Sequence, residues 1–498
     1  MAPNLTSNPL EKHLSALTCY HYYVFVLIFI AKWPLVWHAL SLIFLSPPMD
    51  FYCEGIDNKE NFNKCPCDKP WFDQSVFEAT MQTKFMLYCD RSWLIAFSHC
   101  ICNTGVLVGS LTFGYLSDKY GRLTTFSASC LTIAISGSLV TVMPTITAFT
   151  CMRFFEGMGI GGSIVTSFVL CVEYSATVHR EYITALFHLP LNLGHISMVG
   201  VSYLLRDFDN FQLAISLPIF LLVPLRWLMM ESPKWLLDNA KLTALSTGLE
   251  KFNRQRSSTS IKEEFEQYLQ TGTLNTTAKT VTCFEIFKHK KVVVNFSCMA
   301  IIYFVCGMGY YGVSQFIGEM SGDIHLNVFI SGVSLVPGTI LCMFLLKLLG
   351  RRPLLMMALL CSGIFMICVI LIPETYVWHR VVFACICNAF FFMAFIVSFL
   401  YGVEMFPTSI RNSVLGSLSM VSRVGQIAAP PINSLSEFTA AIFFGIMAIV
   451  GGALCFLLPE TKGIELPSTL EETRRISKKK GDSDGPLRMV SPKAKNGG

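Results

Sequence analysis

Two glutamates in this chain are each followed by an arginine at the same separation. Glu173 precedes Arg180 in the stretch EYSATVHR, and Glu404 precedes Arg411 in EMFPTSIR. Both stretches stand where one long apolar run ends and the next begins, so each glutamate can end one helix while its arginine begins another. Opposite charges at such positions attract one another. The spacing therefore predicts ion pairs between helices at one end of a bundle, with partners within one copy or crossed between the two copies.

Other landmarks recur at nearly the same offset as these pairs. A fixed period along a chain indicates a duplicated structural unit. In a polytopic membrane protein, two parallel halves with a substrate site between them are typical of a secondary transporter. The recurring landmarks are Gly121 and Gly350, Glu231 and Glu460, and, more roughly, Arg153 and Arg380.

The composition is that of a membrane protein. The chain is 53% hydrophobic and only 14% charged, with a mean hydropathy of +0.53, whereas roughly 25% of residues are charged in an average soluble domain. Apolar blocks of about 20 residues recur, the length that a helix needs to cross the hydrocarbon core. We therefore predict an all-α polytopic membrane protein with twelve transmembrane helices in two six-helix halves. The predicted spans are 24–46, 93–114, 124–143, 147–172, 181–204, 211–229, 292–314, 324–347, 353–372, 377–402, 410–434 and 437–458.

Positive charge sets the orientation of these spans. Basic residues crowd the connection after the sixth span and the tail after the twelfth, and the turns on the opposite side are acidic or neutral. We therefore place both termini in the cytoplasm. The net charge of +5 follows from this loop bias and indicates no nucleic-acid partner. The predicted organisation is a cytoplasmic N-terminus (1–23), an N-terminal six-helix half (24–228) with an extracellular loop (47–92), a cytoplasmic linker (229–291), a C-terminal six-helix half (292–458) and a basic cytoplasmic tail (459–498).

Four of the 19 cysteines stand apart from the apolar spans. They lie in the loop on the predicted oxidising side of the membrane, where two disulfides are expected, and four cysteines allow three connectivities. A zinc site built on the CPC triplet is the alternative, but extracellular loops favour disulfides, so no metal is expected. The four are Cys53, Cys65, Cys67 and Cys89.

The turn GYLSDKYGR between the second and third spans concentrates opposite charges. Asp118, Lys119 and Arg122 lie at the predicted cytoplasmic rim, where they can pair with one another and with a helix terminus across the bundle. A charge cluster that forms when this side closes and breaks when it opens would act as a latch. The alternative is that these residues only fix the topology. The predicted gating residues are Asp118, Arg122, Arg153, Glu173, Arg180, Glu231, Arg351, Glu404, Arg411 and Glu460.

This turn resembles the signature of the major facilitator superfamily. Further stretches are similar to solute carrier family 22, the organic cation, organic anion and carnitine transporters: WHALSLIFLSPP, YCDRSWL, YLLRDFDNFQLAIS and YGVEMFPTSIRNSVLGSLSMVSRVGQIAAPP. The resemblance spans about residues 20 to 465 and implies transport of small organic ions by alternating access. The chain departs from the family at Lys347, where an acid is usual, at Leu335, where glutamate is frequent, and at Thr339, where organic anion carriers often have lysine.

The predicted substrate site starts from ionisable groups deep inside spans, because such groups are expensive to bury in lipid. Arg423 lies near the middle of the eleventh span, with Gln426 on the same helical stripe. A guanidinium there favours a carboxylate through bidentate hydrogen bonds. The resemblance adds that anion and zwitterion carriers have arginine at this place, whereas typical cation carriers have an acid. The alternative is that Arg423 pairs with a buried acid such as Glu156.

Aromatic, amide and basic side chains of other spans complete the predicted cavity. Tyrosine rings attract ammonium groups, and a helix face with histidines can bind substrate, relay protons or simply pack against neighbouring helices. The further candidates are Tyr310, Tyr311 and Gln315 in the seventh span, His188, Asn192 and His195 in the fifth, and Lys32 in the first.

Nothing in the chain suggests catalysis. It has no Walker phosphate loop, no Gly-x-Ser-x-Gly and no HExxH, so we expect neither an enzyme nor a cofactor. The sequence favours a secondary transporter, embedded in a lipid bilayer, of a small organic cation or a zwitterion such as a carnitine-like or amino-acid-derived compound. An organic anion transporter and a non-transporting receptor or scaffold are the alternatives, and sodium or a proton could be the coupling ion. No cleavable signal peptide is recognisable, so the first span is expected to target the chain, with the plasma membrane as the default.

Overall fold

The computed structural model describes residues 9–15, 18–53, 63, 65, 67, 70–176, 183, 186–252, 258–272, 290–406 and 411–462. Within these ranges the regular structure is helical apart from one two-stranded sheet. Arg180, one of the predicted gating residues, lies outside the described residues, and of Arg411 only the backbone is described.

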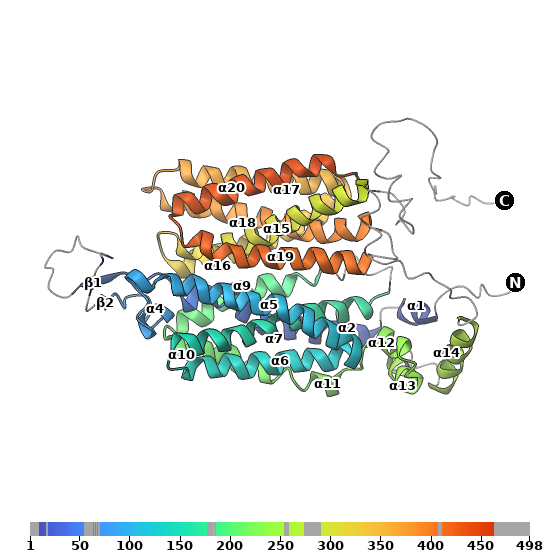
Figure 1. Ribbon diagram of the computed structural model, residues 1–498. Helices are drawn as coiled ribbons and strands as arrows, with labels where there is room; N and C mark the ends of the chain where they lie inside the picture. Colours follow the sequence, from blue (N-terminus) through green and yellow to red (C-terminus); the bar gives the residue numbers. More distant parts are fainter. Residues whose placement is uncertain are drawn as a thin grey trace, which may run out of the picture.

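The two halves of the repeat form two helical bundles that lie side by side, one below the other in Figure 1. The first bundle is built from α2 (Cys19–Leu40), α3 (Leu42–Leu45), α5 (Trp93–Tyr120), α6 (Arg122–Leu139), α7 (Ile146–Glu173), α9 (Leu189–Leu204), α10 (Phe208–Phe220) and α11 (Leu225–Leu228). The second is built from α15 (Lys290–Glu319), α16 (Ile324–Leu348), α17 (Arg351–Leu371), α18 (Val377–Met405), α19 (Arg411–Asn433) and α20 (Glu437–Leu454), followed by the short η4 (Cys455–Leu457).

Ten of the twelve predicted spans correspond to described helices that are long and apolar enough to cross a membrane. The fifth and the eleventh correspond to α9 and α19, which lie in the bundles beside the others (Figure 1). The described part of α9 has only 16 residues, and α19 carries Arg423 and other polar residues within its apolar sequence. The chain is therefore an all-α polytopic membrane protein, and these two exceptional helices hold several of the candidate substrate residues.

The two ends of the bundles differ (Figure 1). One end, here called the loop end, carries an antiparallel sheet in which Tyr52 pairs with Trp71, and the short helices that follow it. The other end, here called the linker end, carries α1 and three helices within the predicted linker, and apolar side chains of α1, α13 and α14 pack together there. The loop-end elements are β1 (Phe51–Cys53), β2 (Pro70–Phe72), α4 (Met81–Lys84) and η1 (Cys89–Arg91), and the linker-end elements are α1 (Pro9–Leu14), α12 (Pro233–Asp238), α13 (Leu242–Phe252) and α14 (Ser258–Gly272).

Glycines allow α5 and α7 to approach closely. A Cβ atom built on Gly161, in the GIGG stretch, would lie 2.1 Å from the carbonyl oxygen of Val106. One built on Gly109 would lie 2.0 Å from the carbonyl oxygen of Met158. Any larger residue would force the two helices apart, as at the small-residue contacts typical of membrane helices.

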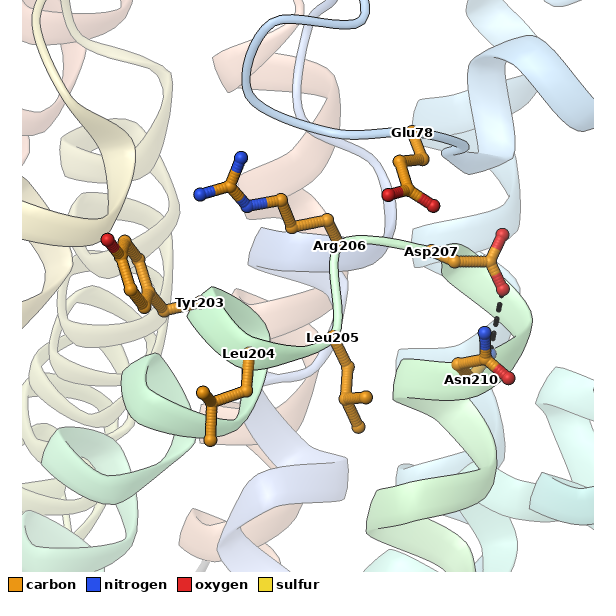
Figure 2. A pocket seen from close by; sticks show the side chains of 7 residues that line it. All are labelled: Glu78, Tyr203, Leu204, Leu205, Arg206, Asp207 and Asn210. Atoms are coloured by element: carbon orange, nitrogen blue, oxygen red, sulfur yellow. Dashed lines mark hydrogen bonds between the residues drawn. The ribbon is translucent and has the colours of Figure 1, made fainter.

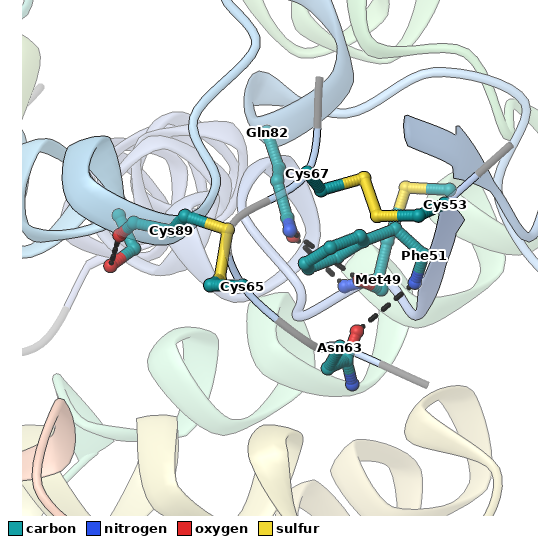
Figure 3. Close-up of a disulfide and its surroundings, with 9 residues drawn as sticks. Met49, Phe51, Cys53, Asn63, Cys65, Cys67, Gln82 and Cys89 are labelled. Atoms are coloured by element: carbon teal, nitrogen blue, oxygen red, sulfur yellow. Dashed lines mark hydrogen bonds between the residues drawn. A yellow bond between two sulfur atoms is a disulfide. The ribbon is translucent and has the colours of Figure 1, made fainter. Parts of the chain in front are cut away.

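The cysteine loop at the loop end contains both disulfides that were predicted, and the structure selects one of the three connectivities (Figure 3). The side-chain oxygen of Asn63 accepts a hydrogen bond from the N–H of Phe51 at 3.0 Å, which ties the loop to β1. The loop is thereby anchored both to the sheet and to η1, the turn that leads into α5. The disulfides are Cys53–Cys67 and Cys65–Cys89.

Removing the Cys65–Cys89 disulfide should destabilise the protein. A disulfide that closes a loop of this size contributes about 3 kcal/mol, mainly by restricting the unfolded chain. We expect Cys65→Ser and Cys89→Ser each to lower the yield of folded protein, and the double variant to resemble either single one because one bond is lost in all three. Mass spectrometry of the non-reduced protein should find the two cross-linked peptides. Free thiols at all four of these loop cysteines in folded protein would contradict the assignment.

Candidate functional site

An arginine–glutamate network holds the linker end of the first bundle together. Nε of Arg122, at the start of α6, lies 3.2 Å from a carboxylate oxygen of Glu173 at the end of α7. Ser232 donates its hydroxyl to the same carboxylate at 2.5 Å. Glu231 accepts hydrogen bonds from two first-turn N–H groups of α6, at 2.8 and 3.3 Å. A carboxylate in this position is favoured by the unpaired N–H groups and by the positive end of the helix dipole.

The second bundle repeats this network. A guanidinium nitrogen of Arg351 lies 2.7 Å from Glu404, and Thr461 donates its hydroxyl to Glu404 at 2.7 Å. Glu460 accepts hydrogen bonds from two first-turn N–H groups of α17, at 3.0 and 3.1 Å. The duplication seen in the sequence therefore extends to the tertiary contacts.

A glycine precedes each capped helix for a physical reason. Gly121 and Gly350 have φ angles of +108° and +114°, a region that other residues rarely adopt. A Cβ atom on Gly121 would also lie 2.4 Å from the carboxylate of Glu231. The glycines thus leave room for the carboxylates that cap α6 and α17.

A contact made by a buried tyrosine also recurs in both halves at the linker end. The hydroxyl of Tyr174 donates to the carbonyl oxygen of Met230, and the hydroxyl of Tyr401 donates to that of Pro459. Burial raises the pKa of Tyr174 well above its usual range, so its hydroxyl keeps the proton that it donates. Each tyrosine ties the end of one long helix to the segment that carries the capping glutamate.

The predicted gating residues that are described at the linker end pair within each bundle, not across the two. The predicted partner Arg180 lies outside the described residues, so that pairing stays a prediction, and the structure gives Glu173 the guanidinium of Arg122. It likewise gives Glu404 the guanidinium of Arg351. These arginines lie far from the acids in sequence, but the start of α6 or α17 lies beside the end of α7 or α18 in space.

One member of the turn motif differs between the two halves. Asp118 forms an ion pair with Arg122 in the first bundle, whereas Lys347 occupies the corresponding place in the second. Lys462 donates from its ammonium group to the carbonyl oxygen of Lys347 at 3.0 Å. The second copy of the turn thus keeps the arginine–glutamate pair but exchanges the acid for a base.

Arg153 does not belong to the linker-end network with which the sequence grouped it. It lies in the half of α7 nearer the loop end, with its side chain fully buried, and donates to Glu156 at 2.9 Å. Nδ1 of His38 in α2 lies 2.6 Å from the other oxygen of that carboxylate, and Gln212 of α10 donates to the same oxygen at 3.2 Å. These four residues form a buried polar cluster that ties α2, α7 and α10 together.

The sequence patterns did not single out His38 and Gln212 as members of this cluster. The signal that could have found His38 is an ionisable residue inside an apolar span, which membrane proteins rarely retain without a function. The i, i+3 spacing of Arg153 and Glu156 places both on one face of a helix. Nothing in the sequence indicated that the first span would meet them there.

A small cavity lies between the two bundles. Side chains that line it include His38, Asn103, Tyr311, Arg423 and Gln426, from α2, α5, α15 and α19. Its volume of about 20 Å³ is room for one water, which needs roughly 10–15 Å³, whereas small-molecule sites usually span about 300–1,000 Å³. The two bundles are thus closed around this point, and a substrate can enter only if they move apart.

Arg423 is half-buried in the wall of this cavity and donates to the side-chain oxygen of Gln426 at 3.0 Å. Within the described part of the chain, no carboxylate lies within 4 Å of its guanidinium. Glu156, the alternative partner considered from the sequence, is engaged by Arg153 and His38 instead. The guanidinium therefore has further N–H groups that could donate hydrogen bonds to an anion in the cavity.

The two tyrosines of α15 face different surroundings. Tyr311 lines the cavity, whereas Tyr310 is 1% exposed and packs against Phe392 in the core of the second bundle. Successive residues of an α-helix point about 100° apart, so only one of the pair can face the cavity. The prediction that Tyr310 lines the cavity does not match this placement.

The candidate residues of α9 lie at the contact between the bundles. Asn192 donates to Thr339 of α16 at 3.0 Å, and the ring of His188 lies edge-on to a phenylalanine of α18 at 5.9 Å. Lys32 of α2 donates to the carbonyl oxygen of Phe187, just before α9, at 2.7 Å. The structure therefore places these groups in inter-helix contacts, outside the lining of the cavity.

Two histidines close the loop end between the bundles. His325 of α16 lies 5.4 Å, ring to ring, from Phe44 of α3 and 5.3 Å from Phe77. Nδ1 of His99 in α5 lies 3.2 Å from the amide nitrogen of Gln315 in α15. Gln315, predicted to line the cavity, thus belongs to this closure.

A larger hollow of about 410 Å³ lies on the surface at the loop end (Figure 2). The turn between α9 and α10 and the segment around Glu78 form its walls, and Tyr203, Leu204 and Arg206 are exposed in it. Asp207 caps α10 by accepting a hydrogen bond from the N–H of Asn210 at 3.0 Å. Because the first bundle alone forms this hollow, it lacks the position between the halves that a transport site requires.

Comparison with known proteins gives a family and several relatives. A family model described as Sugar (and other) transporter matches residues 63–472. Solute carrier family 22 member 3 of Rattus norvegicus is 28% identical, covering 82% of this chain and 74% of the relative. The organic cation transporter protein of Drosophila melanogaster is 29% identical, covering 86% and 80%. Solute carrier family 22 member 6 of Rattus norvegicus is 27% identical, covering 83% and 77%.

Solved structures share the fold. The partially occluded inward-open form of the xylose transporter XylE from E. coli aligns with a TM-score of 0.64 and 16% identity, covering 90% of this chain and 100% of that chain. Its inward-open form aligns with a TM-score of 0.64 over 92% and 100%. At this identity the likeness establishes the arrangement of the two bundles and nothing finer.

A charge swap should identify the partner of Arg122. Arg122→Glu places two acids together at the end of α7, and we expect the melting temperature of the purified protein to fall by roughly 3–10 °C, since each kcal/mol shifts it by about 2–4 °C. Arg122→Glu combined with Glu173→Arg should recover part of the loss. The matched control combines Arg122→Glu with Glu404→Arg, which lies in the other bundle and should give no recovery. Equal recovery by both combinations would contradict pairing within each half.

Proposed function

We propose that this chain, which belongs to the sugar (and other) transporter family of the major facilitator superfamily, moves small organic ions across a membrane by alternating access. The family consists of transporters and not enzymes, and its matched model covers most of the chain. Relatives that carry the names organic cation transporter protein and solute carrier family 22 member support an organic ion as the substrate class.

The observation that carries the proposal is the position of Arg423. A charged side chain near the middle of a span is costly, so it is normally paired with a counter-charge or faces a polar cavity. Arg423 faces the cavity between the bundles, and its described contact is the neutral amide of Gln426. A substrate carboxylate would supply the missing charge through a bidentate contact. The preferred substrate therefore carries a carboxylate.

The same cavity also suits an ammonium group. Tyr311 lines the cavity with an aromatic ring, and such rings attract ammonium ions by about 0.5–2 kcal/mol. A zwitterion, such as a carnitine-like compound or an amino-acid derivative, would use both Arg423 and Tyr311. We therefore place zwitterions first among the substrates.

Alternating access would use the difference between the two ends. At the linker end, the arginine–glutamate networks stabilise each bundle as a unit. At the loop end, stacking of His325 and the contact between His99 and Gln315 join the two bundles. Rocking of one bundle against the other would break these loop-end contacts and preserve the networks, opening the cavity to that side.

The orientation in the membrane follows from two independent features. The linker, which carries many lysines and arginines, belongs on the cytoplasmic side by the positive-inside rule. The disulfides lie at the opposite end, and disulfides persist on the oxidising side of a membrane. We therefore place the linker end and both termini in the cytoplasm and the loop end outside, with the plasma membrane as the proposed location.

Two alternatives are distinguishable by experiment. An organic anion carrier would also use Arg423, but Thr339 stands where such carriers often have a second cation. A non-transporting receptor would bind its ligand saturably without accumulating it. Uptake of carnitine, a quaternary ammonium dye and an aromatic carboxylate, measured beside binding of the same compounds, separates these classes.

Arg423→Ala should abolish recognition of the carboxylate. A hydrogen bond to a charged group contributes about 1.5–3 kcal/mol, so we expect a roughly 10–150-fold loss in kcat/KM for the carboxylate-bearing compounds. Arg423→Lys should recover little, because an ammonium lacks the planar fork of a guanidinium. The measurement is uptake of the three compounds, normalised to the amount of folded protein in the membrane.

Arg380→Ala is the matched control for this prediction. Arg380 is a buried arginine of the same bundle that already has a protein partner, Glu437, at 2.7 Å. Its loss should lower the amount of folded protein and leave the KM of the surviving protein unchanged. An Arg423→Ala variant with a normal protein level and unchanged affinity for all three compounds would rule out the proposed recognition role.

Tyr311→Ala should weaken substrates that carry an ammonium group. The expected change in kcat/KM is roughly 2- to 30-fold, the range that corresponds to one cation–π contact. An aromatic carboxylate without an ammonium group should be less affected. Tyr310→Phe serves as a control, because Tyr310 packs in the bundle core. Equal losses for the ammonium compounds and the plain carboxylate would refute the assignment.

A further inference from the structure

We propose that His38 and Glu156 hold a transferable proton, and that movement of this proton is coupled to the transport described above. The inference rests on the proposed function but concerns a different part of the molecule. It identifies the proton as the coupling ion and places its site in the first bundle, in the buried polar cluster.

The surroundings of the His38 ring require a hydrogen between it and Glu156. Nε2 lies 3.0 Å from the carbonyl oxygen of Ile215, which is only an acceptor, so Nε2 carries a hydrogen. Nδ1 lies 2.6 Å from Oε1 of Glu156. Without a second hydrogen, a lone pair of the ring would face a carboxylate oxygen at hydrogen-bond distance. The pair therefore holds one further hydrogen, on Nδ1 or on the carboxyl group.

The other members of the cluster favour a charged pair in this dry position. The side chains of His38 and Glu156 are 0% exposed, and buried charges persist only where each is compensated. Arg153 donates to Oε2 of Glu156 at 2.9 Å, and Gln212 donates to Oε1 at 3.2 Å. The carboxylate thus receives three donors when the hydrogen is on the histidine. Loss of that proton removes one positive charge and the short contact between α2 and α7.

Among the described residues, the other groups that titrate or carry charge near the cluster come from four elements. The helix α6 contributes Gly137 and α10 contributes Gln212 and Ser216, none of which titrates. The charges of the cluster act on two side chains of α5, one residue of α15 and one of α19 share the cavity with His38, and α9 packs against α2. These groups are His99 and Cys102 on α5, Tyr311 on α15, Arg423 on α19 and His195 on α9.

The pair lies at the wall of the central cavity but is shut off from it in this closed state, because both side chains are 0% exposed. His38 lines that cavity together with Arg423, and its volume of about 20 Å³ accommodates a single water. Both ring nitrogens face protein oxygens here, so the proton leaves only when the bundles move apart. An N–H bond of the imidazolium then breaks, its electron pair stays on the ring, and the proton passes to water that enters. No oxidant or other reactant is needed.

Proton release would act on the closure of the loop end through α2. The contact between His38 and Glu156 anchors α2 to α7, and α2 leads into α3. Phe44 of α3 stacks on His325 of the second bundle. When the proton leaves, the anchor of α2 weakens, and so does the closed position of α3. The protonated pair therefore belongs to the state in which the loop end is closed.

The test uses the purified full-length protein in liposomes. Exchange of labelled for unlabelled carnitine is measured at equal pH, and accumulation of carnitine is measured under an inward gradient of one pH unit. A proton moved with each substrate across that gradient supports up to about tenfold accumulation, since 1.4 kcal/mol is a factor of ten. We expect the wild type to approach this value. In His38→Gln and Glu156→Gln, accumulation should fall to the level without a gradient.

A measurement without substrate accompanies the transport assays. Infrared difference spectra between high and low pH report the imidazole and carboxyl groups that release protons. We expect the wild type to show a coupled histidine–carboxyl change that is missing in His38→Gln and in Glu156→Gln. His13→Gln is the matched control, because His13 lies 3.3 Å from Glu264 in another histidine–glutamate pair, outside the membrane spans. It should keep the spectral change and the accumulation.

The outcomes separate the two proposals. Exchange without any added accumulation under the gradient, or full accumulation by His38→Gln, overturns the coupling site. A wild type that neither exchanges nor accumulates carnitine, the quaternary ammonium dye or the aromatic carboxylate refutes the proposed function. In that case the infrared spectra alone test the proton site. A wild-type protein that lacks the coupled histidine–carboxyl change overturns the proposed site.

Discussion

The cost of placing charge inside a membrane is the constraint on which this structure depends. A charged group in hydrocarbon is strongly destabilised unless a partner compensates it. At the linker end, Arg122 and Arg351 meet carboxylates, and the neighbouring Glu231 and Glu460 use the N–H groups that helix starts leave unpaired. Helix ends, side-chain charges and the following segments are thereby joined in each half. The contacts between the halves, such as the stacking of His325, are the ones that a rocking motion can break.

The same constraint distinguishes two arginines that look alike in the sequence. Arg153 is fully buried with a carboxylate at 2.9 Å, so its charge is compensated by the protein. Arg423 is half-buried in the cavity wall, and its described contact is a neutral amide. A partnered charge stabilises a bundle, whereas an uncompensated charge between bundles is available to a ligand. The lack of a counter-charge among the described residues, rather than depth in the membrane, is what makes Arg423 the better candidate for binding.

Much of the fold could be predicted from the sequence, because apolar length, loop charge and repeat period are local properties of the chain. The partners of side chains were harder to predict. Glu173 has Arg180 nearby in sequence, yet its described partner is Arg122, which is brought to it by the packing of α6 against α7. Tyr310 and Tyr311 are neighbours in sequence, and only the exact rotation of α15 decides which one reaches the cavity. His38 had no partner within its own span, so its meeting with α7 depended entirely on tertiary structure.

The two halves share a scaffold but differ in the polar residues within their spans. Arg380 is the counterpart of Arg153, and it is satisfied by Glu437 of α20 and not by an acid of its own helix. Three residues after Arg380 stands Phe383, where the first half has Glu156. The second half therefore lacks the acid that a buried histidine–glutamate pair would need at this place, and it carries Arg423, to which the described residues give no carboxylate. Under the two proposals above, one half holds the protonatable pair and the other holds the arginine that binds the substrate, so that the motion between the halves links them.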